Sequence, residues 1–378
     1  MSESSHIAII GRGIAGLSSA FELVSRGFSV SLIGPLRTEL SASHASQGVL
    51  STKGHLLAES HAFRAKMHGQ LTIKSWLAKI EKITGAEIRK DFSGVWEYFF
   101  SADEFATINK RVHRGEFSGC HRGKVSSKDE FYRGWHGQIL FKNDPIGSLF
   151  YPSDCWFDAQ QTMSIMEDYL VKSGVTIHDQ CVTDFSVKNE KIIIQTKLGH
   201  AAADEVVIAA GFESQQLLSL LELPLNLVPA AGQVIEFPLV DKVADRTFVK
   251  GASSFSVHYD RLRFGSISKK TEYYGSSDKL AGRLLLVEQL VDKMGISDEL
   301  FNDSEIVDLV GIRARARDRL PLIGPIHSER LGRRVFVFTG LYKNGLQLAH
   351  LCAFQIANIL QGLDGVFSIE PFSPCRYS

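Results

Sequence analysis

Three glycines near the start of the chain have the type and spacing that bind the pyrophosphate of a dinucleotide. Gly11, Gly13 and Gly16 form a G-x-G-x-x-G pattern between a short apolar run, 6–10, and a segment with helical spacing, 14–26. In a strand–turn–helix unit, the first glycine makes the tight turn, the second lets the backbone approach the pyrophosphate, and the third lets the helix pack on the strand. The sequence therefore predicts a dinucleotide site at the positive end of this helix, with a glycine-containing turn in another α/β fold as the alternative.

The second strand of this unit departs from the pattern at its last position. The run 28–33 should lead into an Asp or Glu that accepts hydrogen bonds from the adenosine ribose, but Gly34 stands there. Loss of one hydrogen-bonded acid costs about 1–3 kcal/mol. We therefore expect somewhat loose binding of the dinucleotide, unless Glu39 or Arg12 compensates.

Three later stretches have the composition of backbone that lies against a flat ligand. Residues 41–52 are mostly small and nearly free of charge, and an ordinary mobile loop is the alternative interpretation. The apolar run 205–211 ends in a glycine where a strand would meet a cofactor, and the turn 340–345 precedes a last helix, 346–360. We expect all three to join the glycine turn in one site.

The composition of the chain bounds its class. Its 378 residues fit two domains, and 44% apolar with 22% charged residues is ordinary for a globular protein. Lys plus Arg and Asp plus Glu both number 42, so net charge gives no pull toward nucleic acid or membrane. Five scattered cysteines predict free thiols and no metal site. With no long apolar run and a strand beginning at residue 6, we expect a cytoplasmic protein without a membrane span or signal peptide.

The order of the predicted elements indicates two domains. Residues 224–275 alternate strongly and predict antiparallel strands. Further helices are expected at 60–83, 159–171 and 281–294, and further strands at 95–100, 175–177, 191–196, 205–211 and 335–339. We interpret 191–196 and 205–211 as strands of the first domain resuming. The predicted fold is a Rossmann-like α/β domain (1–86, 147–222 and 300–378) with an inserted α+β domain on an antiparallel sheet (87–146 and 223–299).

A basic run at 110–124 holds five Lys or Arg side chains and two histidines: Lys110, Arg111, His113, Arg114, His121, Arg122 and Lys124. The simpler interpretation of this run is a basic face exposed to solvent, and the alternative is contact with a polyanion.

The motifs together carry a resemblance to a known family. Over residues 6–361 the chain resembles the D-amino-acid-oxidase-like FAD-dependent amine oxidases. The stretch 46–50, the 63–90 helix region and 343–346 are similar to glycine oxidase. Tyr151-Pro152 with Trp156, the stretch 231–234, and 311–313 running into 317–324 are similar to the oxidase half of a bacterial bifunctional tRNA-wobble-modifying enzyme. Both branches remain open.

The resemblance implies a shared chemistry. FAD, bound non-covalently, would accept a hydride at its N5 from the α-carbon of a neutral amine, the imine would hydrolyse, and O2 would reoxidise the flavin to give H2O2. The implied substrate is glycine, an N-substituted glycine or an amino acid. The flavin performs the hard step, so the protein must bind, orient and desolvate.

The resemblance also implies the site residues. Arg313 falls at the substrate-binding arginine, where a guanidinium pairs bidentately with a carboxylate, and a structural salt bridge is the alternative. Lys343 stands where glycine oxidases carry a second arginine, and Phe255 at the position of a tyrosine over the substrate. His258 and Tyr259 are expected in a hairpin. The implied cofactor contacts are Gly11, Gly13, Ile14, Ala15, Gly16, Gly34, Ser46, Gln47, Gly48, Val49, Val182, Ala210, Gly211, Gly340, Lys343, Asn344, Gly345, Leu346 and Gln347.

Two other functions stay open at this point. The first is an oxidase acting on carboxymethylaminomethyl-uridine in tRNA, favoured by the basic run and disfavoured by zero net charge, because phosphate contacts supply most nucleic-acid affinity. The second is a flavoprotein that modifies or assists a protein partner. The sequence does not indicate the oligomeric state.

Overall fold

The first sheet has six strands and forms the base of the cofactor unit. The computed structural model describes residues 5–36, 40–52, 60–114, 124–126, 141–239, 245–251, 253–259, 261–300 and 305–377. The strand order is β19-β20-β13-β1-β2-β9, and every neighbouring pair is parallel except β19–β20. The strands are β1 (His6–Ile10), β2 (Ser29–Ile33), β9 (Thr176–His178), β13 (Glu205–Ile208), β19 (Leu322–Ser328) and β20 (Arg333–Thr339).

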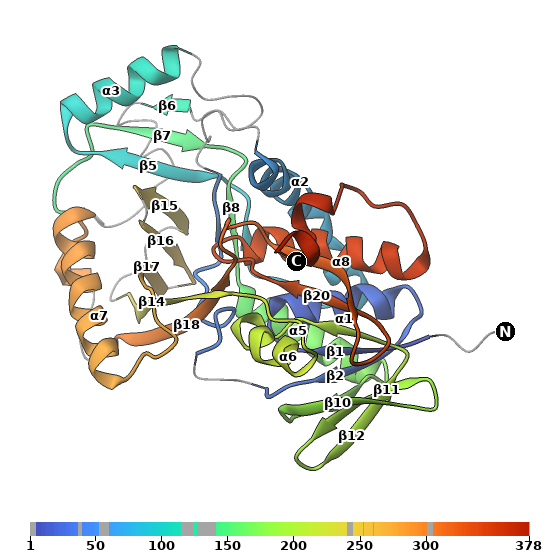
Figure 1. Ribbon diagram of the computed structural model, residues 1–378. Helices are drawn as coiled ribbons and strands as arrows, with labels where there is room; N and C mark the ends of the chain where they lie inside the picture. The colour runs from blue at the N-terminus through green and yellow to red at the C-terminus, as the bar shows by residue number, and fades with distance from the viewer. Residues whose placement is uncertain are drawn as a thin grey trace.

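Both faces of this sheet are covered, which explains why its strands read as continuous apolar runs. One face packs on α1 (Ile14–Ser25), α2 (His61–Thr84), α5 (Ala159–Lys172) and α8 (Gly345–Gln361). The other packs on α6 (Ser214–Leu220) and on a small antiparallel sheet of β10 (Val182–Lys188), β11 (Lys191–Thr196) and β12 (Gly199–Ala203). The unit therefore has three layers, with the small sheet at its lower edge (Figure 1).

The small sheet contains the predicted strand 191–196. This strand, β11, pairs with β10 and β12 and not with a strand of the six-stranded sheet. Its side chains Ile192 and Ile194 turn toward the parallel sheet and share a core with it. An apolar run of six residues fits either position, so the sequence pattern could not separate them.

The second sheet has eight strands in the order β18-β14-β17-β16-β15-β5-β7-β6. All pairs are antiparallel except β15–β5. The strands are β5 (Val95–Phe99), β6 (Lys124–Ser126), β7 (Gly147–Tyr151), β14 (Val228–Pro238), β15 (Arg246–Lys250), β16 (Ser253–His258), β17 (Arg261–Lys269) and β18 (Val307–Arg315). The predicted antiparallel strands within 224–275 are confirmed by β14, β15, β16 and β17.

Helices pack on both faces of the second sheet, α7 (Ser276–Glu288) on one and α3 (Ala102–His113) on the other. The helix α7 continues into a π-helical turn (Gln289–Lys293), and Leu286 and Leu290 pack on an aromatic core that includes Tyr98 and Phe255. The helix α3 packs by Phe105 at the β5–β7 end, the upper left in Figure 1. The described residues also form 3-10 turns at Gly211–Glu213, Asp298–Leu300, Glu370–Phe372 and Pro374–Tyr377.

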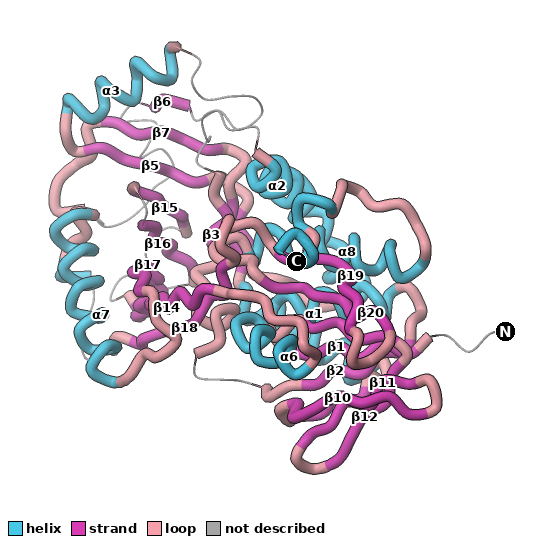
Figure 2. Tube along the Cα trace, viewed as in Figure 1, coloured by secondary structure: helices cyan, strands magenta, loops and turns pink. Residues whose placement is uncertain are grey.

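The two sheets are joined by a small three-stranded sheet and by backbone bridges. The small sheet holds β3 (Val49–Leu50), β8 (Cys155–Phe157) and β4 (Lys90–Asp91), while Ser41 forms a bridge with Ile312, and Leu341 with Arg315. Figure 2 shows the strands of the two large sheets meeting near the middle of the molecule. β7 and β18 pair in the eight-stranded sheet, although they fall within the ranges 147–222 and 300–378 that the sequence assigns to the first domain.

Part of the basic run lies outside the described residues, and so does Glu39. Of that run, Lys110, Arg111, His113 and Arg114 lie at the end of α3 and just beyond it, while 115–123 are not described. Within the described part of the chain, no helix is long and apolar enough to cross a membrane, and no cluster of His, Cys, Asp or Glu is arranged to hold a metal ion.

Close packing of α1 on β1 gives the first prediction. A Cβ atom built on Gly16 would lie 1.9 Å from the carbonyl oxygen of Gly11, so Gly16→Ala must push the helix off the strand. We expect a cost of about 3 kcal/mol, which exceeds the ~1 kcal/mol that alanine gains in a helix. Thermal unfolding should show a midpoint several degrees below that of the unmodified protein.

Ser18 on the same helix is the matched control. Its hydroxyl is buried without a hydrogen-bond partner, so Ser18→Ala should leave the midpoint unchanged or raise it. An unchanged midpoint in Gly16→Ala would show that the helix tolerates displacement.

Candidate functional site

A cavity of about 900 Å3 lies where the two large sheets meet. Its walls come from segments that are far apart in the sequence: the β1–α1 turn, the loop 40–49, the ends of β13 and β20, the start of α8, and the inner face of the eight-stranded sheet. Every site residue predicted from the sequence lines this cavity except Gly16 and Phe255. Gly16 contributes through the packing described above.

The β1–α1 turn forms a cradle that a side chain would fill. Gly11 has φ +118°, and a Cβ there would lie 2.3 Å from the carbonyl oxygen of Ala209. Helix α1 begins after Gly13 without a side-chain cap, and the hydroxyl of Ser43 accepts from the N–H of Ile14 at 3.1 Å. The remaining N–H groups of the first turn face no helical acceptor, which makes this turn a site for an anion.

A second helix begins at the same cavity. Helix α8 starts after Asn344 without a side-chain cap, and Gly345, Leu346 and Gln347 line the cavity. The helix is held in place by α2, where a Cβ on Gly69 would lie 2.0 Å from the carbonyl oxygen of Gln347. Two positive helix ends therefore meet one cavity, which suits a ligand with negative charge at two places.

The loop 44–48 lies on the wall of the cavity, and four of its backbone carbonyl oxygens accept hydrogen bonds from residues behind the loop. Four donors from β8, α5 and β17 hold them: Gln160 Nε2 to His44 O (2.5 Å), Arg263 Nη1 to Ser46 O (3.4 Å), Trp156 Nε1 to Gln47 O (2.8 Å) and Phe157 N to Gly48 O (3.2 Å). Gly48 has φ +84°, and a Cβ there would lie 2.2 Å from the carbonyl oxygen of Phe157. The loop can approach β8 this closely because residue 48 is glycine.

The side chain of Gln47 ties this loop to the eight-stranded sheet. Its Nε2 donates to the carbonyl oxygen of Ser254 at 2.8 Å, and its Oε1 accepts from the Ser254 hydroxyl at 2.6 Å. Ser254 lines the cavity, and its neighbour on β16, Phe255, points to the opposite face. Phe255, which the resemblance places over the substrate, therefore does not line this cavity. Alternation along β16 places Phe255 and Val257 in the aromatic core.

Arg313 reaches the cavity from β18 with a guanidinium nitrogen that has no partner. Its Nη1 is buried and makes no hydrogen bond, and burial lowers the pKa of the guanidinium, while the nearby phenol of Tyr342 acts in the opposite direction. A Cβ on Gly232 of β14 would lie 2.3 Å from Nη1 and from Nη2. Glycine at 232 thus makes the room in which the guanidinium lies. A buried guanidinium nitrogen without a hydrogen-bond partner among the described residues favours an anionic ligand beside it.

The position of the missing ribose-binding acid has a backbone explanation. Gly34 has φ +148°, a conformation that an Asp or Glu would adopt only with strain. The carbonyl oxygen of Gly34 accepts from Nη1 of Arg12 at 3.3 Å. The Arg12 guanidinium is 7% exposed and is paired with Glu167, with Asp179 3.5 Å away. A buried arginine with fixed partners therefore stands beside Gly34, and it lines the cavity.

Several lining residues were not among those predicted from the sequence. Ser254 could have been found from the strand alternation that puts Phe255 and Val257 in the core. Ser266 could not, because a register shift between the pairs Gln233–Ile267 and Val234–Gly265 interrupts the alternation of β17.

Tyr342 also lines the cavity and has a left-handed backbone conformation (φ +50°), which no pattern in the sequence predicts. Glu213 lines the cavity, and burial raises its pKa. Lys343 is exposed, with its Nζ 5.7 Å from the centre of the Tyr342 ring.

These features fit FAD. The uncapped start of α1, together with the glycines of the β1–α1 turn, suits a pyrophosphate. The start of α8 and the loop 44–48 suit a flat polar ring system. The cavity runs continuously between them, from Arg12 and Gly34 to Arg313.

Comparison with known proteins supports this interpretation. A family profile described as FAD dependent oxidoreductase matches residues 6–359. The chain is 22% identical to glycine oxidase of Geobacillus kaustophilus, over 98% of this chain and 97% of that protein. It is 24% identical to the tRNA 5-methylaminomethyl-2-thiouridine biosynthesis bifunctional protein MnmC of Shewanella amazonensis, over 98% of this chain and 59% of that protein. The chain spans about half the length of the bifunctional relatives it matches.

A solved structure confirms the fold. Iminodiacetate oxidase from Chelativorans sp. BNC1 superposes with a TM-score of 0.82 at 20% identity, covering 97% of this chain and 98% of that chain.

The network beside Gly34 predicts how the adenosine end is held. Arg12→Ala removes the donor to the Gly34 carbonyl and leaves Glu167 without its partner, so the apoprotein should bind FAD roughly tenfold more weakly, or about 1.4 kcal/mol. Fluorescence titration of the apoprotein with FAD measures this.

Asp179→Asn is the control for that measurement. The Asp179 side chain is 64% exposed and 3.5 Å from Arg12, so its loss should change FAD affinity much less. Equal affinities in Arg12→Ala and the unmodified protein would exclude a role for Arg12 in holding FAD.

Proposed function

The chain belongs to the FAD dependent oxidoreductase family, and from that membership we propose that it oxidises the C–N bond of glycine, an N-substituted glycine or another amino acid. The observation that carries the proposal is the buried, unpaired Nη1 of Arg313 in the cavity wall. A carboxylate is the ligand whose geometry and charge match a guanidinium. An amine next to that carboxylate is what the names of the relatives suggest, glycine oxidase and iminodiacetate oxidase among them.

The residues of the chain would bind and orient the substrate rather than take part in acid–base chemistry. Bound FAD supplies the hydride acceptor, and O2 is the expected final acceptor, giving H2O2. Arg313 holds the carboxylate and so fixes the α-carbon in the cavity. The inner face of the sheet contributes Val234, Ser254 and Ser266 rather than a ring, which leaves space for an N-substituent beside the amine.

The tRNA alternative keeps support from one comparison, the likeness to MnmC. The basic residues of α3 do not add to it, because no residue of that helix lines the cavity. A flavoprotein that assists a protein partner is the other alternative, and both are outcomes of the same assay.

Peroxide release tests the proposal directly. The holoenzyme is given glycine, sarcosine, iminodiacetate, a set of D-amino acids, and tRNA carrying carboxymethylaminomethyl-uridine. Release with one of the small amines is the expected result. Release with the tRNA alone would favour the first alternative, and no release despite bound FAD would favour the second.

Arg313 and Gly232 provide a paired prediction for the substrate that turns over. Arg313→Leu should raise KM roughly 10- to 100-fold, because hydrogen bonds to a charged group contribute about 1.5–3 kcal/mol. Gly232→Ala should also raise KM although the guanidinium is still present, because the new Cβ occupies its place. FAD affinity should remain unchanged in both.

Arg315→Leu is the control, because Arg315 follows on the same strand and contacts the Tyr342 ring without lining the cavity. If Arg315→Leu raised KM as much as Arg313→Leu, the effect would belong to the strand and not to the guanidinium.

A further inference from the structure

In the loop 44–48, the C=O and the N–H of one peptide group lie in different surroundings. The peptide between Ser46 and Gln47 has its carbonyl oxygen bound to Arg263, behind the loop. Its N–H, that of Gln47, has no acceptor among the described residues, although the N–H groups of Ala45, Ser46 and Gly48 are each bonded within the loop. Gln47 lines the cavity, so this N–H is the donor that the loop keeps for a ligand.

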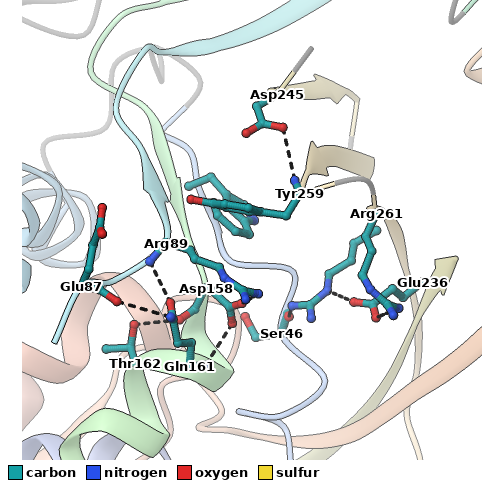
Figure 3. A network of polar contacts seen from close by, with 12 residues as sticks. Ser46, Glu87, Arg89, Asp158, Gln161, Thr162, Glu236, Asp245, Tyr259 and Arg261 are labelled. Atoms are coloured by element: carbon teal, nitrogen blue, oxygen red, sulfur yellow. Dashed lines mark hydrogen bonds and ion pairs between the residues drawn. The ribbon is translucent and has the colours of Figure 1, made fainter. Parts of the chain in front are cut away.

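Arg263 is held firmly behind that carbonyl. Its side chain is 12% exposed, and its Nε forms an ion pair with Glu236 of β14. Glu236, itself 9% exposed, also binds Nη1 of Arg261 at 2.9 Å (Figure 3). The third charged or titratable neighbour is His258, whose pKa is lowered to about 3 by burial and by Arg263, so the imidazole is neutral. Arg263 is therefore the cation that faces the Ser46 carbonyl.

We propose that Arg263 is a positioning residue that strengthens the Gln47 peptide N–H as a donor to bound FAD and thereby raises the reduction potential of the flavin. A cation that binds the carbonyl oxygen of a peptide draws electron density from its nitrogen, and hydrogen bonds linked in this way strengthen one another. Reduction makes the flavin ring more electron-rich, so a stronger donor favours the reduced form. The inference rests on bound FAD and not on which amine is oxidised.

Other contacts of the loop 44–48 hold this peptide group in place. Trp156 donates to the next carbonyl, that of Gln47, and stacks on His258 with ring centres 3.9 Å apart. The Gln47 side chain is fixed on Ser254. The peptide cannot rotate without breaking these contacts, so loss of the Arg263 contact changes the strength of the donor more than its place.

The chain offers a matched control in Arg261. Both arginines pair with Glu236, and replacing either leaves the other to neutralise that carboxylate. Arg261 is 54% exposed and makes no contact with Ser46 among the described residues. Arg263→Gln and Arg261→Gln thus remove the same charge from the same cluster, and only the first removes the contact with the peptide.

Anaerobic equilibration of the holoenzyme with a reference dye measures the potential. Arg263→Gln should bind reduced FAD, relative to oxidised FAD, about tenfold less favourably than the unmodified protein, which is about 30 mV for a two-electron couple. Arg261→Gln should keep the potential of the unmodified protein. Arg263→Lys should shift the potential in the same direction by less, because one ammonium cannot serve Glu236 and the carbonyl together.

Two results would overturn the proposal. Equal shifts in Arg263→Gln and Arg261→Gln would show that charge alone matters. An unshifted potential in the variants at position 263 would show that the carbonyl contact has no effect on the flavin. If Arg263→Gln fails to fold, Arg263→Lys and Arg261→Lys decide in the same way. None of these measurements needs an amine substrate, so they stand apart from the peroxide assay.

Discussion

A buried guanidinium nitrogen without a partner is costly, because it has lost its water and gained no acceptor in return. In this protein that nitrogen is Nη1 of Arg313, and the surrounding structure keeps it where it is. β18 carries the residue to the cavity, and the missing side chain of Gly232 gives the guanidinium its place. A carboxylate bound there would repay the cost of burial, which makes substrate binding and relief of this unpaired charge the same event.

The cofactor half of the site depends on close approach of backbone to backbone. Gly11 and Gly16 allow α1 to pack against the end of β1, and Gly48 allows the loop 44–48 to pack against β8. The loop is also bonded to the eight-stranded sheet through Gln47 and Arg263. This wall of the cavity is therefore fixed to the small three-stranded sheet and to the eight-stranded sheet, and a change in either sheet reaches the cavity through this loop.

The sequence predicted the local elements and the lining of the cavity better than the assembly of the sheets. The glycine spacing, the helical spacing of 60–83 and the strand alternation of 224–275 are local patterns, and the helices and strands they predict are present. The strand 191–196 was predicted, but its apolar run does not specify its partners, which are β10 and β12. Phe255 was placed over the substrate by similarity of position, whereas alternation along β16 puts it in the core. The contacts of Arg12 with Glu167 join residues 155 positions apart, and no pattern within one sequence could reveal them.

The central claim is that a carboxylate on the substrate is recognised by Arg313 in a cavity that holds FAD. Anaerobic mixing of the holoenzyme with an N-substituted glycine, and separately with the amide of the same amine, tests it most directly through the loss of the oxidised flavin absorbance. The carboxylate should reduce the flavin quickly, and the amide should do so at least tenfold more slowly, a difference of about 1.4 kcal/mol in transition-state binding. Equal rates for the two compounds would contradict the account, because Arg313 would then have no part in recognising the substrate.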